Sequence, residues 1–425
     1  MTTAYQRIPL SERIGFSEIL DTKLKTNTLK ICLFQPLSAE TASACALAGD
    51  LATSSNAKYP SNQQMNQKLH LLYGADLGSS VSRQGDLQMV TIHASAIDDR
   101  YALENEPIFA ELTEILLDCL RVPNVTNDAF DAQEFQIKQK ELLDNIDAEI
   151  NEKRVYAIQQ ASKIAYQNEP AARSSYGSRE EALALTPKSA YAAFRKMLRE
   201  ARVEIFFVGP QKRPELPEKL KTTFDAFGSV TTAPLVFYAP SSKKAEPAYV
   251  KEVLPVNQSK LVMIWKTDCT DRYAVKMMTL LLGGTPSSKL FANVREKMSL
   301  CYYCAANYTE LKQALQVDSG VETANLEKTQ TAITAQLDAI ANGEVSDVEL
   351  QSAWMFVHNS LKSIGDTASS YISWYLGQLF RDTNLTPTEE EDLYLQVTKE
   401  QIVAAAKSMQ LDTVYTLRTP EQEDY

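Results

Sequence analysis

The sequence LLGGTPSSKLFANVREKMSLCYYCAAN, residues Leu281–Asn307, contains a glycine pair, a helical pattern and a strand pattern in succession. The glycine pair is typical of a helix C-terminal stop. Ser287 or Ser288 is expected to cap the next helix, because a hydroxyl oxygen can accept a hydrogen bond from a free N–H group of the first turn. Apolar residues spaced at i, i+4 and i+8 predict one buried face of this helix: Leu290, Val294 and Met298.

Positive charge in the last turn of this helix, at Arg295 and Lys297, suits the helix dipole. From Leu300 onward, two sets of residues alternate with the period of a strand: Leu300, Tyr302, Cys304 and Ala306, and Cys301, Tyr303 and Ala305. The pair Cys301-x-x-Cys304 has a spacing that is used for zinc or redox chemistry. In a regular strand, however, residues three apart point to opposite faces, and no second Cys or His pair follows. We therefore predict that these two thiols have no metal or redox role.

Composition and charge indicate an ordinary globular protein. The chain has 425 residues and a net charge of -11. No concentrated Lys/Arg segment is present, so nucleic-acid binding is disfavoured. No apolar run approaches the roughly 20 residues that cross a bilayer, and the start of the chain has no signal-peptide pattern. The six cysteines are scattered, as reduced thiols would be, which favours a cytoplasmic location without a membrane partner.

The two halves of the chain show the same order of patterns. In each half a strand, Leu29–Pro36 or Lys260–Lys266, precedes a long helical run, from about Asn127 to Asn168 or from Asp347 to Phe380. Similar letters, LTPKSAYAAFRKM and VTKEQIVAAAKSM, come before the last strand of each half. A repeat at an offset of about 210–220 residues indicates an internal duplication of an α+β unit. We predict an N-terminal half (1–227), a linker (228–247) and a C-terminal half (248–425).

The run from Leu290 to Tyr302 resembles a signature of the pitrilysin/insulinase-type (inverzincin) zinc peptidases, in the processing-peptidase-like branch. That signature is L-x-x-x-(I/V)-R-E-K-x-x-L-x-Y, and Arg295 and Tyr302 match it in register. The resemblance implies two similar halves that enclose a chamber, each a mostly antiparallel sheet with helices packed on one side. It also implies that Arg295 and Tyr302 bind the backbone of an extended peptide substrate across from the zinc ion.

Active members of this family bind zinc through H-x-x-E-H on a helix of the first half and through a later glutamate. Alignment outward from Tyr59-Pro60 and from the YGADL run places these positions at non-ligand residues, with Lys138 in place of a further carboxylate. A catalytic zinc ion needs three protein ligands, so we expect no metal and no catalytic residue in this chain. The three histidines, His70, His93 and His358, are too far apart in sequence to replace the motif. The vacated positions are Ala46, Gly49, Asp50 and Asn145.

The chain therefore resembles the non-catalytic members that occur beside an active paralogue in Firmicute-type bacteria. That type is named for its association with 5-aminopentanol modification of elongation factor P. The resemblance implies a zinc-free subunit of a peptidase heterodimer, in which zinc belongs to the active partner. A peptide-binding or scaffolding protein that acts as a homodimer without proteolysis is the alternative. An active metallopeptidase with a substitute zinc site is disfavoured for lack of ligands.

Overall fold

The chain divides into two compact units, and neither is continuous in sequence. The computed structural model describes residues 4–230 and 233–420. Unit 1 comprises Met1–Asp147, Arg173–Phe237 and Gly365–Gly377, and unit 2 comprises Ala148–Ala172, Tyr238–Ile364 and Gln378–Tyr425. Residues 228–230 and 233–247, which lie within the predicted linker, form no helix or strand.

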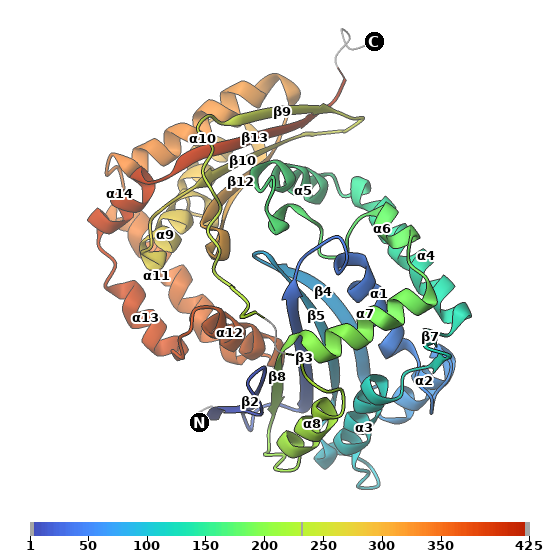
Figure 1. Cartoon of the computed structure of the whole chain (residues 1–425). Helices are drawn as coiled ribbons and strands as arrows, with labels where there is room; N and C mark the ends of the chain where they lie inside the picture. The colour runs from blue at the N-terminus through green and yellow to red at the C-terminus, as the bar shows by residue number, and fades with distance from the viewer. Residues whose placement is uncertain (1–3, 231–232, 421–425) are drawn as a thin grey trace. The chain divides into compact units, whose positions relative to one another are not determined.

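Unit 1 is built on a six-stranded sheet in the order β1-β2-β8-β3-β5-β4 (Figure 1). All neighbouring strands are antiparallel except β2 and β8, which are parallel. The strands are β1 (Ala4–Pro9), β2 (Ile14–Leu20), β3 (Thr26–Pro36), β4 (Asp76–Gln84), β5 (Leu87–Ile97) and β8 (Arg202–Gly209).

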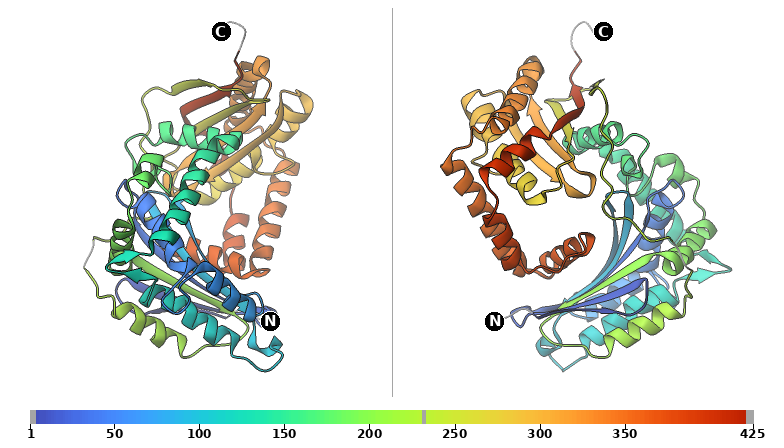
Figure 2. Two further views of the ribbon diagram at one scale, coloured as in Figure 1. Left: turned by 90° about the vertical axis from the view of Figure 1, so that its right-hand side faces the viewer. Right: turned by 60° about the vertical axis from the view of Figure 1, so that its left-hand side comes forward.

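Helices cover one face of this sheet, and the main core of unit 1 lies beneath them (Figures 1 and 2). Strand β3 supplies Leu29, Ile31 and Leu33, which are two apart and therefore share a face. The helices that pack there are α1 (Ala42–Ser54), α3 (Ile108–Arg121), α7 (Pro187–Glu200) and α8 (Leu216–Asp225). The remaining elements of this part are α2 (Asn62–Leu71), the short strands β6 (Val125–Thr126) and β7 (Ala129–Phe130), α4 (Ala132–Ala148) and α6 (Arg179–Leu183).

Unit 2 repeats the strand order of unit 1. Its sheet runs β11-β12-β10-β13-β9, which corresponds to β4-β5-β3-β8-β2. The directions agree as well, because β13 and β9 are parallel and the other pairs antiparallel. The predicted α+β class and the duplication are confirmed. The strands are β9 (Ala248–Val253), β10 (Ser259–Lys266), β11 (Cys301–Thr309), β12 (Ala314–Val321) and β13 (Gln410–Arg418).

Both faces of the unit 2 sheet are covered, which explains why β10 reads as a continuous apolar run. One face packs under helices that follow the strands in sequence. The other face packs under α5 (Lys153–Ala165), whose Ala157, Ala161 and Ala165 lie one turn apart and contact Val262 and Ile264. Alanine lets the helix approach the sheet closely. The helices on the first face and beyond it are α9 (Arg272–Thr279), α10 (Leu326–Ala341), α11 (Asp347–Lys362), α13 (Pro387–Leu395) and α14 (Lys399–Lys407).

The two long helices predicted from the sequence are each broken, and the breaks coincide with the ends of units. The first run becomes the β6–β7 hairpin, α4, a 3-10 turn at Glu149–Asn151 and α5. The second becomes α11, a 3-10 turn at Ser363–Gly365 and α12 (Ala368–Phe380). Unit 2 thus receives α5 from the first half, and unit 1 receives most of α12 from the second.

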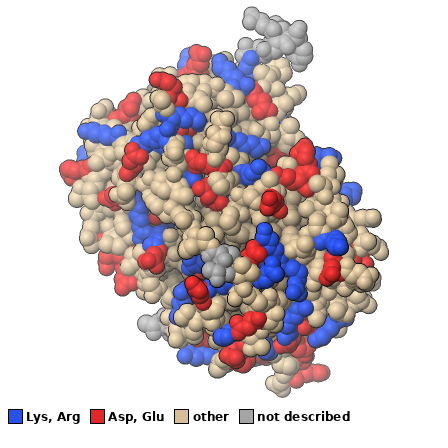
Figure 3. Space-filling model, in the orientation of Figure 1, with Lys and Arg blue, Asp and Glu red and all other residues tan. Residues whose placement is uncertain are grey.

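The surface shown in Figure 3 carries Lys and Arg side chains interspersed with Asp and Glu. Across residues 4–230 and 233–420, the structure contains no helix with both the length and the apolar character needed to span a bilayer.

Candidate functional site

Helix α1 carries three of the positions that the sequence comparison predicts for the zinc motif of active relatives, namely Ala46, Gly49 and Asp50. Ala46 is buried, with 7% of its surface exposed, and its methyl group offers no ligand atom. Gly49 is also buried, and a side chain there would be crowded, because an added Cβ would lie 3.1 Å from Cγ1 of Val90. Asp50 is exposed and accepts a hydrogen bond from the Ser79 hydroxyl. The surrounding protein nevertheless removes water from this carboxyl and raises its pKa.

Helix α4 lies beside α1 and places a positive charge near Asp50. The Ser54 hydroxyl donates to Glu134 Oε2 at 3.1 Å, and the charges of Lys138 and Glu141 act on Asp50 one turn farther along. Lys138 and Glu141 are themselves paired at 2.8 Å. Asn145, the position predicted for the third ligand, lies one turn beyond Glu141 on α4. The structure therefore brings the end of α1 close to the first turns of α4 and places the Lys138 ammonium group near Asp50.

These residues do not fit a zinc ion. Of the four predicted positions only Asp50 bears a ligand atom that zinc favours, and a catalytic site uses three protein ligands. Within the described parts of the chain, no three His, Cys, Asp or Glu side chains gather as a metal site would need. The histidines are dispersed: His93 Nε2 lies 3.0 Å from Asp76, His358 pairs with Glu391, and His70 is exposed on α2.

The Arg/Tyr motif occupies a helix, a turn and an edge strand of unit 2. Arg295 lies in the helical segment Leu290–Lys297, and Tyr302 lies on β11, which has a neighbour on only one side. Ser299 between them has φ +52°, a left-handed conformation that turns the chain sharply from helix to strand. The amide of Leu300 bonds to the carbonyl of Val294 at 3.1 Å and closes the turn.

Both motif side chains are accessible to a ligand. The Arg295 side chain is 41% exposed, and its guanidinium lies 4.6 Å from the centroid of the Phe291 ring. Tyr302 is 59% exposed, and its hydroxyl donates to Glu322 Oε1 at 3.1 Å. That carboxylate opposes ionisation and raises the pKa of Tyr302. The sequence analysis did not predict that Phe291 would contact Arg295 or that Glu322 would accept a hydrogen bond from Tyr302. Phe291 is four residues before Arg295, which places it one helical turn away.

The helix that carries Arg295 differs from the prediction in two ways. It is a π-helix, with Met298 N bonding to Asn293 O at 2.9 Å. Its wider turns put more than 3.6 residues in each turn, so Leu290 and Val294 are buried but Met298 is 50% exposed. The predicted cap is also wrong. Neither Ser287 nor Ser288 caps the helix by its side chain, and the Ser287 hydroxyl is instead paired with that of Thr285. Such π-helical segments occur frequently at functional sites.

The strand that carries Tyr302 contains a β-bulge, which overturns the expectation that the two cysteines point to opposite faces. The register shifts between Cys301 and Tyr303, so that Tyr302 has no partner on β12. Cys301 then lies opposite Val321 and Cys304 opposite Ser319. Positions two apart on a strand share a face, so the two cysteines lie on the same face. The alternation in the sequence could not reveal the extra residue.

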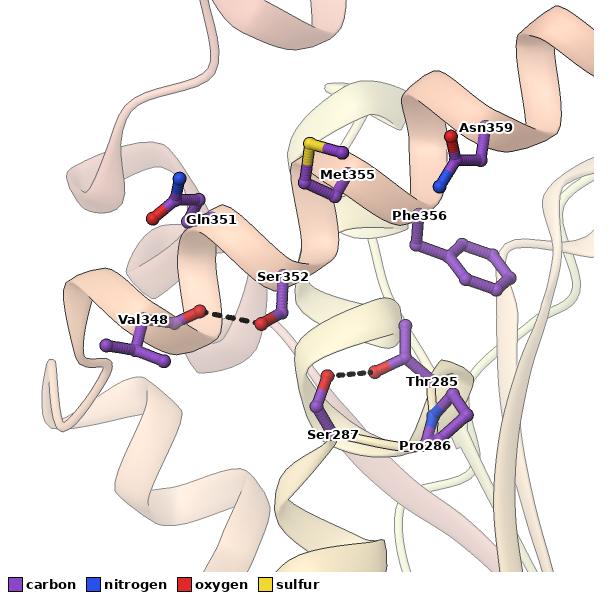
Figure 4. Close-up of a pocket in the computed structure, with 9 residues that line it drawn as sticks. All are labelled: Thr285, Pro286, Ser287, Val348, Gln351, Ser352, Met355, Phe356 and Asn359. Atoms are coloured by element: carbon purple, nitrogen blue, oxygen red, sulfur yellow. Dashed lines mark hydrogen bonds between the residues drawn. The ribbon is translucent and has the colours of Figure 1, made fainter.

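A hollow with a volume of about 410 Å³ lies beside the start of the motif helix (Figure 4). The loop that precedes the helix forms one wall, where the hydroxyls of Thr285 and Ser287 are hydrogen-bonded at 3.3 Å. Helix α11 forms the other wall with the exposed apolar side chains of Val348 and Met355. None of the lining residues is titratable, so the hollow offers shape and apolar contact rather than acid–base chemistry. The complete lining is Thr285, Pro286, Ser287, Val348, Gln351, Ser352, Met355, Phe356 and Asn359.

The chain is similar to known proteins over nearly its whole length. A model of the family described as "Peptidase M16 inactive domain" matches residues 184–355. The curated "Probable inactive metalloprotease YmfF" of Bacillus subtilis (strain 168) is 25% identical over 404 residues, covering 94% of each chain. The crystal structure of a conserved protein from Enterococcus faecalis V583 matches with a TM-score of 0.89 at 25% identity, covering 98% of this chain and 99% of that chain.

A second crystal structure, of a peptidase M16 inactive domain from Pseudomonas fluorescens, has a TM-score of 0.79 at 16% identity and covers 98% of both chains. At this identity the similarity bears on the fold alone. The family match, the inactive relative and the absence of ligand atoms at Ala46, Gly49 and Asn145 agree with one another. The chain is similar to the inactive homologues of the M16 peptidase family, over residues 184–355 by the family model and over 94% of its length by the curated relative.

Proposed function

We propose that this chain is the zinc-free subunit of a peptidase heterodimer and binds extended peptides for a zinc-bearing partner. Arg295 and Tyr302 would contact the peptide backbone. The observation that carries the proposal is that both side chains are exposed on consecutive elements, while three of the four vacated zinc positions carry no side chain that zinc favours. Zinc would belong to the partner alone.

The chemistry of the two side chains suits backbone recognition. A guanidinium offers five N–H donors in a fixed plane, and a phenol offers one O–H donor. The Arg295 guanidinium stacks on the Phe291 ring, 4.6 Å from its centroid, and Glu322 orients the Tyr302 hydroxyl by accepting its hydrogen bond. Carbonyl oxygens occur at every residue of a peptide, so such donors position a chain without selecting its side chains. Holding the scissile bond in place is itself a catalytic contribution.

The free edge of β11 supports the same role. Tyr302 lies on this edge strand, and an extended peptide can bind an exposed edge by main-chain hydrogen bonds. The bulge leaves the Tyr302 backbone outside the β11–β12 ladder. We propose a cytoplasmic setting for this reaction, because all six cysteines are free thiols, as expected in a reducing compartment.

The test mixes this chain with a zinc-bearing M16 chain from the same organism and follows cleavage of an unstructured, quenched fluorogenic peptide. Activity should appear only in the mixture. Arg295→Ala removes charged hydrogen bonds worth ~1.5–3 kcal/mol, which corresponds to a loss in kcat/KM of ~10- to 150-fold. Tyr302→Phe removes a neutral hydrogen bond worth ~0.5–1.5 kcal/mol, or ~2- to 10-fold.

Two matched controls separate the motif from general surface effects. Lys297→Ala removes a positive charge from an exposed residue on the same helix as Arg295. Tyr249→Phe removes a hydroxyl from a residue that is 61% exposed on β9, the other edge strand of the same sheet. Both controls should retain the activity of the mixture. An equal loss in the controls and the motif variants would refute the assignment of Arg295 and Tyr302.

The alternative function, a peptide-binding or scaffolding homodimer without proteolysis, shares the same residues. It predicts an inactive mixture together with peptide binding by this chain alone, measured by fluorescence anisotropy of the same peptide. The family resemblance also connects this type of chain to 5-aminopentanol modification of elongation factor P. Adding elongation factor P to the mixture and measuring its mass tests that connection.

A further inference from the structure

The two thiols of Cys301 and Cys304 form a pair that the proposed function does not use. They lie opposite Val321 and Ser319, two positions apart on β12. Two strand steps amount to roughly 6.6 Å between Cα atoms. That separation falls within the ~4.4–6.8 Å between Cα atoms that a disulfide spans. Without the bulge, three strand steps and opposite faces would keep the sulfur atoms apart.

The pair is chemically asymmetric. The neighbouring Cys304 thiol, together with the Arg295 charge, lowers the pKa of Cys301 to about 7. The Cys301 thiol, together with burial, raises the pKa of Cys304. Cys301 is thus the nucleophile of the pair and Cys304 its protonated neighbour. At Cys32, Cys45 and Cys119 no such thiol neighbour is present among the described residues, and burial raises the pKa to about 12, 11 and 12.

A structural zinc site does not explain the pair, because such sites use four ligands. In the part of the chain that the structure describes, no third Cys, His, Asp or Glu joins the two thiols in a metal-binding group. A nucleophilic thiol with a second thiol beside it is instead the arrangement of a reversible redox site.

We infer that Cys301 and Cys304 are a redox-active dithiol, which peroxides oxidise to a disulfide within β11 and small thiols reduce again. The Cys301 thiolate attacks one oxygen of hydrogen peroxide, the O–O bond breaks and hydroxide leaves as water after taking up a proton. The sulfenic acid on Cys301 is then attacked by the sulfur of Cys304, which loses its proton, and a second water leaves. The two thiols lose two electrons and peroxide gains them.

The inference rests on the bulge and the thiol pair, and not on peptide binding. Trypsin supplies a direct readout, because cleavage after Lys297 and Lys312 releases a peptide, residues 298–312, that contains both thiols and no other cysteine. The full-length folded chain is treated with substoichiometric hydrogen peroxide, its remaining thiols are alkylated, and the digest is analysed by mass spectrometry. The expected product is this peptide lighter by two hydrogen atoms and unalkylated, restored by dithiothreitol.

Cys269 is the internal control. It is more exposed than Cys301 and Cys304, which are each 9% exposed, and trypsin releases it alone in the peptide 267–272. If exposure alone decided reactivity, Cys269 would oxidise first. We expect the pair to be oxidised at least ten times faster, because Cys301 has the larger thiolate fraction at neutral pH.

A variant resolves the order of steps. In Cys304→Ser the sulfenic acid on Cys301 has no neighbour to attack it and should be trapped by dimedone, while in the unsubstituted chain trapping should be at most weak. Faster oxidation of Cys269, over-oxidation of Cys301 to a sulfinic acid without disulfide in the unsubstituted chain, or one tightly bound zinc released by peroxide would each overturn the inference. The measurement on the unsubstituted chain does not depend on the folding of any variant.

Discussion

The hydroxyl of Tyr302 on β11 donates a hydrogen bond to Oε1 of Glu322, which directly follows β12, over 3.1 Å. The contact joins the exposed end of an edge strand to its only neighbour in the sheet. It holds the phenol in one orientation, and it also occupies the donor that a bound peptide would need. A peptide carbonyl must therefore compete with Glu322 for the hydroxyl proton.

Glu322→Gln should lower the pKa of Tyr302 toward its usual range. The carboxylate raises this pKa because it accepts the hydrogen bond and repels the phenolate, and an amide keeps the acceptor without the charge. The measurement is a pH titration of ¹³Cζ-labelled tyrosine by NMR, in which Tyr302→Phe identifies the resonance. An unchanged Tyr302 titration in the Gln variant would mean that the two side chains do not meet in solution.

Arg154→Leu should destabilise unit 2, because it leaves a buried carboxylate without its partner. Arg154 on α5 bonds through Nε to Asp318 Oδ2 at 2.5 Å, and Asp318 is 1% exposed. Removing one member of a buried pair costs ~3–5 kcal/mol; we expect about 2–4 kcal/mol because the Arg154 side chain is half exposed. Urea unfolding followed by circular dichroism measures the change.

The double variant Arg154→Leu with Asp318→Asn is the matched control for this prediction. It removes the stranded charge as well as the guanidinium, so part of the lost stability should return. Equal stability of the single and double variants would contradict the pairing of α5 with this sheet face. The guanidinium also lies 4.5 Å from the ring centroid of Tyr303, and the loss of this contact remains in both variants.

Sequence patterns predicted the duplicated α+β fold because strand and helix periods are local properties. They could not predict that α5 and α12 change units. The stripe Ala157, Ala161 and Ala165 shows that α5 packs closely against something, but not against which sheet. In unit 1, Tyr371 of α12 donates to Asp21 at 2.7 Å, a contact between residues 350 positions apart. Such pairings depend on the whole chain and leave no local signature.

Of the candidate site, the sequence predicts the residue types but not the local backbone geometry. Residue identities alone place Arg295 and Tyr302 in the family signature and leave Ala46, Gly49 and Asn145 without ligand atoms. The π-helix and the bulge were missed, because each adds a residue to a regular period without changing residue types. Those two irregularities decide which side chains meet around the motif.

The alkylation rate of Cys301 should rise steeply through about pH 7, because only the thiolate reacts and the neighbouring Cys304 thiol lowers the pKa of Cys301 to about 7. The rate with iodoacetamide, followed on the 298–312 peptide, should be half-maximal near that pH. In Cys304→Ala the stabilising thiol is lost, and the midpoint should move to higher pH. A midpoint above pH 8 in the unsubstituted chain, near that of an ordinary thiol, would contradict the thiol–thiol contact.

Rebuilding the ligands should create a zinc site if the alignment of α1 with α4 is right. In Ala46→His with Asp50→His, two imidazoles lie four residues apart on one helical face, and Asn145→Glu adds a carboxylate from α4. We expect about one zinc per chain after dialysis, measured by atomic emission. The same chain without Asn145→Glu should bind more weakly, since a catalytic-type site needs the third ligand. Peptidase activity should still be absent, because Gly49 supplies no general base, and a side chain there would meet Val90 at 3.1 Å. Equal zinc affinity with and without Asn145→Glu would show that α4 carries its third position elsewhere, with Glu141 one turn earlier as the next residue to test.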